Sequence, residues 1–373
     1  MLSDVVKEFS CRNKDLRVQK VYSVTNSDGF MPSQDYFSKD VFSKDLSNYK
    51  IVRKGMLAYN PSRINIGSVA CLQSEDEVIV SPLYVVVEVN EKKLLAEYLN
   101  LFLHSDIALE QIKSLTSGSV RDSLKYNAFT RLCLPIPTVE MQRAVIKKLN
   151  AIKKLIVKRE QQLSKLDQLA KSRFSEMFAN GDFPCQKLGT FCHVGSSKRV
   201  FVEELQSEGI PFFRGTEIGQ LAAGKPVAPS LFITKSHYEA LCSCSGKPQC
   251  GDLLLPSICS DGRIWCVNTD RPFYFKDGRV LWVKVPKSVN GCYLRFALSQ
   301  SIIRNYNTLA SGITFAELKI ISLKEAPVPV PPLELQNGFA AFIEQLDKSK
   351  VTIRKSIEKL ETTYRALLQE YFG

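Results

Sequence analysis

The chain has 373 residues, of which 45% are hydrophobic and 24% are charged. This composition is typical of a folded globular protein, and it excludes a disordered chain, a collagen-like repeat and a small disulfide-stapled scaffold. Fifty Lys and Arg residues against 38 Asp and Glu residues leave a net charge of +12, which favours a polyanionic partner.

The first ten residues carry Asp4 and Glu8 and lack the apolar stretch of a secretory signal peptide. Apolar runs in the chain stay below the roughly 18 residues of a membrane helix, so we expect no membrane association. The 11 cysteines are an odd number in a long chain without an export signal. We therefore expect reduced thiols and a cytoplasmic location.

Two globular regions are predicted, at residues 1–138 and 179–332, each followed by a long helix. Runs of β-branched and aromatic residues predict strands at 78–80, 83–87, 273–275 and 280–283. Helices are predicted to follow these strands, at 98–112 and 293–306. Each globular region is therefore predicted to combine strands and helices, which places the fold in the α/β (α+β) class.

An internal repeat is the strongest feature of the sequence. Residues 115–178 align with residues 309–372 without a gap, and 15 of the 64 pairs are identical. The identical pairs include a proline motif, P-x-P-x-x-E-x-Q, at 135–142 and 329–336. A repeat of this length exceeds the 20–50 residues of a solenoid, so it indicates a duplicated domain followed by a helix.

The two long helices are predicted at 139–178 and 333–373. Prolines precede each one, Thr138 is a suitable N-cap, and Glu140 and Glu334 lie near the positive helix starts. Apolar residues then follow a 4-3-4-3 spacing, which is typical of a coiled-coil seam. The seam residues are Val145, Leu149, Ile152, Ile156, Leu163, Leu166, Ala170 and Met177, and Phe339, Ile343, Leu346, Ile353, Ile357, Leu360, Tyr364, Leu367 and Tyr371.

The simplest partner for each helix is the other one, giving a mutual coiled coil. The alternative is two amphipathic helices that each pack on their own domain. The first helix and the second globular region carry nearly all of the positive charge: the net charge is +1 for residues 1–138, +6 for 139–178, +5 for 179–332 and zero for 333–373. This distribution favours a surface that follows phosphates, and the alternative is a solvated lysine-rich helix face.

The repeated motif resembles that of the specificity (S) subunit of type I restriction-modification systems. The matching strings are LPIPTVEMQ (134–142) and VPPLELQ (330–336). GIPFFRGTEI (209–218) is similar to the segment that opens many target-recognition domains, and YNPSRINIGS (59–68) is similar to a core segment of another domain subtype.

The resemblance implies two target-recognition domains, at 1–138 and 179–332, that each read one half of a bipartite DNA sequence. It implies that the helices at 139–178 and 333–373 pair antiparallel, set the gap between the half-sites and dock methyltransferase (M) subunits, of which we expect two. Restriction (R) subunits complete the complex. S-adenosylmethionine, ATP and Mg²⁺ are expected on these partners, and this chain is expected to carry no cofactor and no catalytic residues.

The first half lacks a clear counterpart of the string at 209–218, although residues 21–25 could occupy its place. We therefore expect two domain subtypes that read different half-sites.

A catalytic site is not indicated by the sequence. The P-loop pattern is absent, and Asn60-Pro61-Ser62 only superficially resembles a methyltransferase motif. Cys242, Cys244 and Cys250 raise the alternative of a zinc site, but their spacing lacks the usual C-x2–4-C pairs and favours ordinary thiols.

The resemblance implies that double-stranded DNA is the partner. Bases could be read by Arg and Lys side chains, which suit guanine, and by Asn and Gln side chains, which suit adenine. Candidate residues are polar or basic and lie near glycines in predicted loops. They are Asn60, Ser62, Arg63, Asn65, Ser119 and Arg121 in the first domain, and Ser197, Lys198, Arg199, Arg214, Thr216, Ser260, Arg263 and Thr314 in the second. For each of them, turn formation or ordinary surface polarity is the alternative.

Two other functions remain open from the sequence. One is a stand-alone coiled-coil regulator or adaptor that binds DNA or protein without partners. The other is the recognition half of a single-chain restriction enzyme, which is disfavoured because no catalytic domain is evident in the chain.

Overall fold

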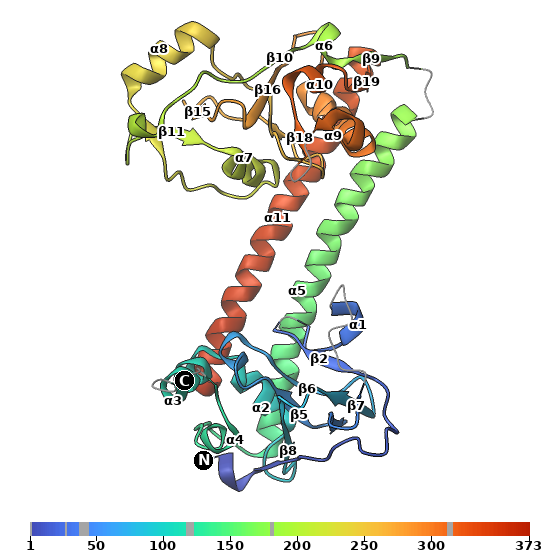
Figure 1. Ribbon diagram of the computed structural model, residues 1–373, viewed down its shortest axis with the longest axis vertical. Helices are drawn as coiled ribbons and strands as arrows, with labels where there is room; N and C mark the ends of the chain where they lie inside the picture. The colour runs from blue at the N-terminus through green and yellow to red at the C-terminus, as the bar shows by residue number, and fades with distance from the viewer. Residues whose placement is uncertain (1, 27, 37–44, 117–122, 180–182, 312–315) are drawn as a thin grey trace. The chain divides into compact units, whose positions relative to one another are not determined.

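A computed structural model describes residues 2–26, 28–36, 45–116, 123–179, 183–311 and 316–373. The chain forms two compact units. Unit 1 comprises Met1–Gln162 together with Ile353–Gly373, and unit 2 comprises Leu163–Thr352. Both units combine strands and helices, and two helices far longer than the others join them along the chain, as the predicted fold class requires (Figure 1).

Unit 1 is built around a four-stranded antiparallel sheet with the strand order β1-β8-β5-β6. Its strands are β1 (Val6–Glu8), β5 (Leu57–Tyr59), β6 (Val69–Cys71) and β8 (Val85–Val89). Two further antiparallel pairs are β2 (Tyr22–Val24) with β3 (Phe30–Pro32), and β4 (Lys50–Arg53) with β7 (Glu77–Val80). The short helices are η1 (Leu2–Asp4), α1 (Ser33–Tyr36), η2 (Ile64–Ile66), α2 (Ala96–Leu103), α3 (Asp106–Thr116) and α4 (Tyr126–Phe129).

Unit 2 contains a sheet with the equivalent order, β10-β16-β13-β14. Its strands are β10 (His193–Gly195), β13 (Leu253–Pro256), β14 (Trp265–Cys266) and β16 (Val280–Lys284). A second sheet joins β11 (Ile210–Phe213), β12 (Phe232–Ile233) and β15 (Tyr274–Phe275), and small pairs join β9 (Cys185–Lys187) to β19 (Pro327–Pro329) and β17 (Ala310–Ser311) to β18 (Glu317–Leu318). The shorter helices are α6 (Leu188–Phe191), η4 (Val202–Glu204), α7 (Gly215–Ala222), α8 (Lys235–Ser245), α9 (Gly291–Leu309) and α10 (Ile320–Lys324).

The repeat seen in the sequence is therefore also a repeat of sheet topology. The similarity extends to strand pairing outside the main sheets: Val21 forms a parallel bridge with Ile79, and Phe212 pairs in parallel with Tyr274. Residues 21–25 thus lie where the sequence comparison suggested a counterpart of 209–218.

Alternation along the strands gives each main sheet two apolar faces. In unit 2, Leu253 and Leu255 pack into the core formed with the long helices, whereas Leu254 packs into a second core with α7 residue Ile218. Unit 1 follows the same rule, with Leu57 in the helix-side core and Ala58 in the other. The period of two along a strand explains this division.

Most of the predicted short elements are present, with one difference. The helix predicted at 98–112 is two helices, α2 and α3, separated at His104. The Ser105 hydroxyl accepts a hydrogen bond from the Ala108 N–H at 3.2 Å, so Ser105 begins a new helix where a continuous one was expected. The helix predicted at 293–306 is α9, which is two to three residues longer at each end and is capped by Asn290.

The two long helices, α5 (Val139–Phe174) and α11 (Leu333–Phe372), are each anchored by the glutamine of the repeated proline motif. The buried Gln142 amide accepts a hydrogen bond from the Leu95 N–H at 2.8 Å and donates to the carbonyls of Lys93 and Pro137. Gln336 is used in the same way, since it accepts from the Asn290 N–H at 2.9 Å and donates to Pro331. Thr138 is confirmed as an N-cap by a hydrogen bond from the Met141 N–H.

Replacing this anchor is expected to destabilise unit 1. Gln142→Ala leaves the buried Leu95 N–H and two carbonyls without their partner, which should lower the free energy of unfolding by about 3 kcal/mol. Gln161→Ala, an exposed change on the same helix, is the matched control and should leave stability within about 0.5 kcal/mol of the wild type. Urea titration followed by circular dichroism checks both, and equal stabilities of the two variants would contradict the anchor role.

Each unit contains the start of one long helix and the end of the other. In unit 1, the Lys148 ammonium of α5 donates to the Tyr371 hydroxyl of α11 at 3.0 Å, and Lys153 lies over the Tyr364 ring. In unit 2, Lys350 of α11 pairs with Asp167 of α5 at 2.6 Å. Further along α5 in unit 2, Phe174 packs against Phe339 of α11 with ring centroids 5.5 Å apart. In each unit a later residue of α5 thus contacts an earlier residue of α11, so within each unit the helices are antiparallel.

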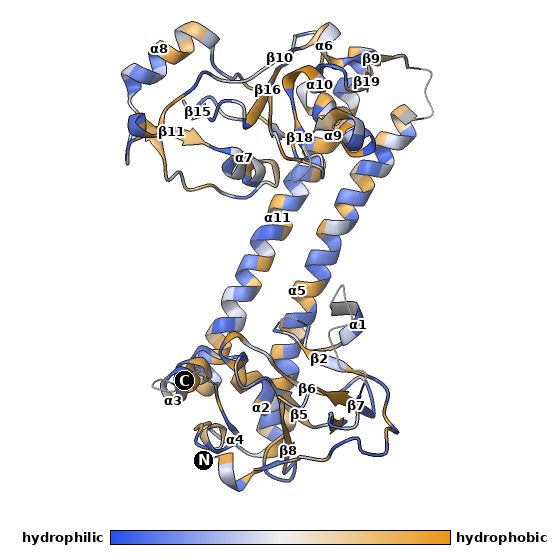
Figure 2. Cartoon of the chain, in the orientation of Figure 1, coloured by the Kyte–Doolittle hydropathy of each residue, from blue (hydrophilic) through white to orange (hydrophobic). Residues whose placement is uncertain are grey.

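The predicted seam residues are all buried or half-buried in the structure, whereas Figure 2 shows hydrophilic residues over most of the rest of α5 and α11. Aromatic residues close the seam at each helix end. Phe178, in the π-helical turn Ser175–Ala179, packs against Tyr293 with ring centroids 4.8 Å apart, and Phe372 packs against Tyr98 at 5.0 Å. These phenylalanines are equivalent in the sequence repeat, which explains why the match extends to its last position.

Candidate nucleic-acid interface

Equivalent loops in the two sheets carry many of the predicted DNA-contacting residues. Residues 60–68 join β5 to β6 in unit 1, and residues 257–264 join β13 to β14 in unit 2. Near its end, each loop contains a glycine with positive φ, +90° at Gly67 and +66° at Gly262, a conformation that favours glycine. The structure thus brings Asn60, Ser62, Arg63 and Asn65 together on one loop, and Ser260 and Arg263 on the other.

The loop in unit 1 presents polar side chains from a fixed backbone. The Asn60 carboxamide oxygen accepts a hydrogen bond from the Ser62 N–H at 3.1 Å, and the Arg63 carbonyl accepts from Ile66 and Ser68. Ser62, Arg63 and Asn65 are exposed. Because these hydrogen bonds within the loop hold its backbone, the side chains of Ser62, Arg63 and Asn65 remain available to a ligand.

A second segment lies beside this loop. The Leu124 N–H donates to the Pro61 carbonyl at 2.9 Å, and a surface cavity of about 470 Å³ is lined by Asn60, Ser62, Lys125 and Asn127 among others. The predicted residues Ser119 and Arg121 lie outside the described residues. Ser123, Lys125, Tyr126 and Asn127, which the sequence analysis did not select, are polar residues of the described part of this segment that line the cavity.

Three of the basic residues that lie near one another in the sequence of unit 1 are paired with acids. Arg17 and Arg53 both contact Glu77, at 3.2 and 2.9 Å, and Lys20 contacts Glu75 at 2.7 Å. Lys14, Lys54 and Arg63 form no ion pair within the part of the chain that the structure describes. Exposed pairs of this kind contribute little to stability, and they reduce the net field that the clusters offer to phosphates.

The predicted residues at 197–199 in unit 2 have internal partners. The Ser197 hydroxyl donates to the Phe275 carbonyl at 2.6 Å, and the Lys198 N–H donates to the Tyr274 hydroxyl at 2.9 Å. Arg199 pairs with Asp277 at 3.2 Å. The hydroxyl of Ser197 is therefore occupied, and the side chains of Lys198 and Arg199 are the groups that this segment offers to a ligand.

The string at 209–218 forms a strand, a turn and a helix, from β11 into α7. The Arg214 guanidinium holds the Glu217 carboxylate through Nε at 3.2 Å and Nη2 at 2.7 Å, and the Arg214 N–H also donates to it at 2.9 Å. Burial opposes ionisation of Glu217, but these hydrogen bonds outweigh burial and lower its pKa. Thr216 is exposed on the first turn of α7.

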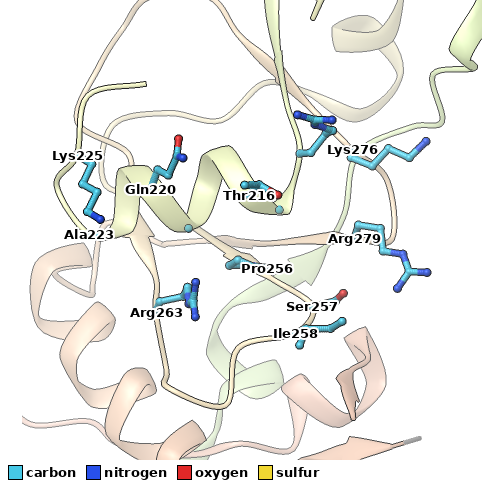
Figure 3. Close-up of a pocket in the computed structure, with 13 residues that line it drawn as sticks. Thr216, Gln220, Ala223, Lys225, Pro256, Ser257, Ile258, Arg263, Lys276 and Arg279 are labelled. Carbon is cyan, nitrogen blue, oxygen red and sulfur yellow. The ribbon is translucent and has the colours of Figure 1, made fainter. Parts of the chain in front are cut away.

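A cavity of about 640 Å³ lies between α7, the 257–264 loop and the β15–β16 turn. Figure 3 shows Thr216 and Gln220 on α7, with Arg263, Lys276 and Arg279 on neighbouring segments. Five cationic side chains line it: Arg214, Lys225, Arg263, Lys276 and Arg279. Concave basic surfaces that also carry hydroxyl and amide groups suit DNA, since phosphates and base edges can both be contacted.

Sequence reasoning selected Arg214, Thr216 and Arg263 of this cavity and missed Gln220, Lys225, Lys276 and Arg279. Lys276 and Arg279 flank an Asp-Gly turn, with Gly278 at φ +65°, which is a hairpin signal that could have found them. Gln220 and Lys225 carried no such signal. Ser260 is exposed on the same loop as Arg263, and Thr314 lies outside the described residues.

The three cysteines considered for zinc do not form a metal site in the described part of the chain. Within these residues, groups of three or more His, Cys, Asp or Glu side chains that could hold a metal ion are absent. The Cys250 thiol instead donates to the Asp270 carboxylate at 3.3 Å. Every helix among the described residues is too short or too polar to cross a membrane.

Comparison with known proteins gives one family. A family model described as the type I restriction modification DNA specificity domain matches residues 181–362. The chain is 21% identical over 358 residues to a Methanocaldococcus jannaschii protein assigned as the specificity subunit of the type I restriction enzyme MjaX, covering 89% of this chain and 80% of that one. It is also 21% identical over 293 residues to a Haemophilus influenzae protein assigned as the type I specificity subunit S.HindORF215P, covering 73% and 72%.

Solved structures give the same fold. A chain from a type I R-M system, studied for its assembly and conformational transition, matches all of this chain and 96% of its own length, with a TM-score of 0.59 and 18% identity. The type I restriction-modification S subunit from M. genitalium matches all of this chain and 95% of its own length, with a TM-score of 0.54 and 13% identity.

Proposed function

Because the chain belongs to the family of type I restriction-modification specificity subunits, we propose that it selects the DNA sequence on which such a complex acts. Each unit reads one half of a bipartite target. Methyltransferase subunits, two in the simplest assembly, and restriction subunits bind this chain and carry out the chemistry in the cytoplasm.

The observation that carries the proposal is the equivalent placement of two polar loops on two equivalent sheets. The β5–β6 loop offers Asn60, Ser62, Arg63 and Asn65, while the β13–β14 loop offers Ser260 and Arg263 beside α7. One scaffold thus presents two different sets of hydrogen-bonding groups. Two different base sequences joined in one target are the ligand that this arrangement suits.

The long helices have two roles in this proposal. The helices have fixed lengths and pair within each unit, so they set the number of unread base pairs between the half-sites, as the spacing of a dimeric DNA-binding protein does. Their exposed faces, rich in charged residues, are the surface on which methyltransferase subunits dock. S-adenosylmethionine, ATP and Mg²⁺ then belong to the partner subunits, and this chain contributes recognition.

The direct test is to express the chain with its cognate methyltransferase subunit in a host that lacks adenine methylation, and to sequence the genome by a method that detects methyladenine. We expect methylation at a two-part motif with an unspecified gap. The methyltransferase expressed alone is the control and should methylate no specific motif.

A continuous motif, or no motif despite a cognate methyltransferase, would contradict the proposal. Gel-shift assays of the chain with and without the methyltransferase separate it from a stand-alone regulator. Tight, sequence-specific binding by the chain alone, with no change on adding the methyltransferase, would favour the regulator.

A further inference from the structure

Arg263 is held by a neighbouring carboxylate along one edge of its guanidinium. Its Nε lies 2.9 and 2.8 Å from the two carboxylate oxygens of Asp261, and its Nη2 lies 2.8 Å from one of them. A planar guanidinium has a second pair of parallel donors, on Nη1 and Nη2. This second edge stays free of Asp261, and the Arg263 side chain is 51% exposed.

The position of the guanidinium is further restricted by α7. A Cβ atom at Gly219 would lie 3.3 Å from both Cδ and Nη1 of Arg263, so the arginine packs on the part of the helix where a side chain is missing. Gly262, with φ at +66°, fixes the turn that carries Asp261 and Arg263. The Arg263 plane is thus defined by a carboxylate on one side and a helix surface on the other.

Among the other cations of the cavity, the two lysines are less restricted, and Arg279 contacts Glu317 through Nη1, which belongs to the outer edge of its guanidinium. Lys225 forms no ion pair among the residues that the structure describes, and Lys276 approaches Asp277 only to 3.7 Å. Arg214 is also held by a carboxylate, that of Glu217. Its backbone N–H donates to the same carboxylate, and Arg214 is the N-cap of α7, so this ion pair belongs to the start of the helix. Loose point charges suit phosphates, whereas an oriented guanidinium edge suits two parallel acceptors.

We propose that Arg263 determines specificity in the half-site read by unit 2, by donating from Nη1 and Nη2 to the O6 and N7 acceptors of a guanine. Lys225 and Lys276 contact phosphates. This inference rests on the proposed function, and it adds that the half-site contains a guanine whose recognition depends on Asp261 and Gly219 as positioning residues. Guanine is the base whose major-groove edge has two adjacent acceptors, which is the match that a bidentate arginine requires.

The experiment compares the methylated motifs of the wild type and four variants, each expressed with the cognate methyltransferase. For Arg263→Ala we expect one position of one half-site, where the wild type requires guanine, to accept any base. The preference for guanine over the other bases at that position should fall about 10- to 100-fold. Gly219→Ala keeps the arginine but displaces it, so it should relax the same position to a smaller extent. Arg263→Lys should relax it too, since lysine lacks the second parallel donor.

Lys225→Ala is the control. This variant should leave the motif unchanged and lower methylation evenly across all sites. The slope of the logarithm of the DNA-binding constant against the logarithm of the salt concentration should become smaller in magnitude by about one. Thermal unfolding of each variant identifies any that fails to fold, and Gly219→Ala, which places a better helix former in α7, keeps the test valid if Arg263→Ala is unstable.

An unchanged motif in folded Arg263→Ala and Gly219→Ala, or an even loss of methylation as for Lys225→Ala, would overturn the guanine assignment and make Arg263 a phosphate contact. If the wild-type half-site read by unit 2 contained no guanine, the guanine assignment would also be overturned. These outcomes leave the wild-type two-part motif intact, whereas failure of the proposed function removes that motif from the wild type itself.

Discussion

Removing one heptad from each long helix is expected to shorten the gap of the recognised motif by up to about three base pairs. Seven residues of helix correspond to about 10 Å, and the duplex rises about 3.4 Å per base pair. The contacts Lys153–Tyr364 and Asp167–Lys350 have the same register, which places residues 155–161 opposite residues 356–362. Deleting these two segments together preserves the seam on both sides of the cut.

Methyladenine sequencing of the double deletion gives the new gap directly, and both half-sites should stay the same. Deleting residues 155–161 alone is the matched control. It offsets α5 against α11 by one heptad and separates Lys153 from Tyr364 or Asp167 from Lys350, so we expect methylation to be lost. If the double deletion were active with the original gap, the helices would not be the spacer.

Replacing residues 179–332 with the corresponding region of another specificity subunit is expected to change one half-site completely and to leave the other half-site unchanged. Unit 2 supports such an exchange because α7 packs on one face of the β10-β16-β13-β14 sheet, which also carries the β13–β14 loop. The other face of this sheet packs against α5 and α11. The graft must keep aromatic residues at 293 and 296, since these rings contact Phe174 and Phe339.

The reciprocal exchange of residues 1–138 is the control, and it should change only the other half-site. Sequencing of methylated genomes reads both results. If either exchange altered both half-sites, or neither, the recognition functions would not be separated between the two units.

Elements that depend on local sequence were predicted well. Every residue that the heptad pattern placed in the seam of α5 and α11 is buried or half-buried, although the pattern omitted Phe174 and Phe372, and the prolines marked the helix starts to within a residue. Strands rich in valine, such as β7 and β8, were also found. The extra helix boundary at Ser105 was missed because one hydroxyl decides it within an otherwise continuous apolar pattern.

Features that depend on distant partners could not be predicted. The repeat showed that Gln142 and Gln336 are equivalent, but only the fold shows that each amide accepts a hydrogen bond from a backbone N–H that is 47 or 46 residues away in sequence. At the candidate interface, residue type identified Ser197 as a hydrogen-bonding group, yet its donor is taken by Phe275. Conversely, Lys276 reaches the cavity through the pairing of β15 and β16 with other strands, which local patterns do not reveal.

The domain boundaries at 138, 178 and 332 remain predictions, since the compact units divide the helices at other points. The guanine assignment for Arg263 likewise needs the fold, because the two contacts that orient the arginine come from Asp261 nearby and from Gly219 on a separate helix.

The insertion of unit 2 within unit 1 has a consequence for biosynthesis. Tyr98 and Phe102 emerge early from the ribosome, but the Phe372 ring that covers them is made almost last. At about 5–20 residues per second, the intervening 190 residues of unit 2 take roughly 10–40 s to synthesise. Unit 2 is continuous in sequence and can complete its core first, while unit 1 waits with an exposed aromatic surface that chaperones are suited to protect.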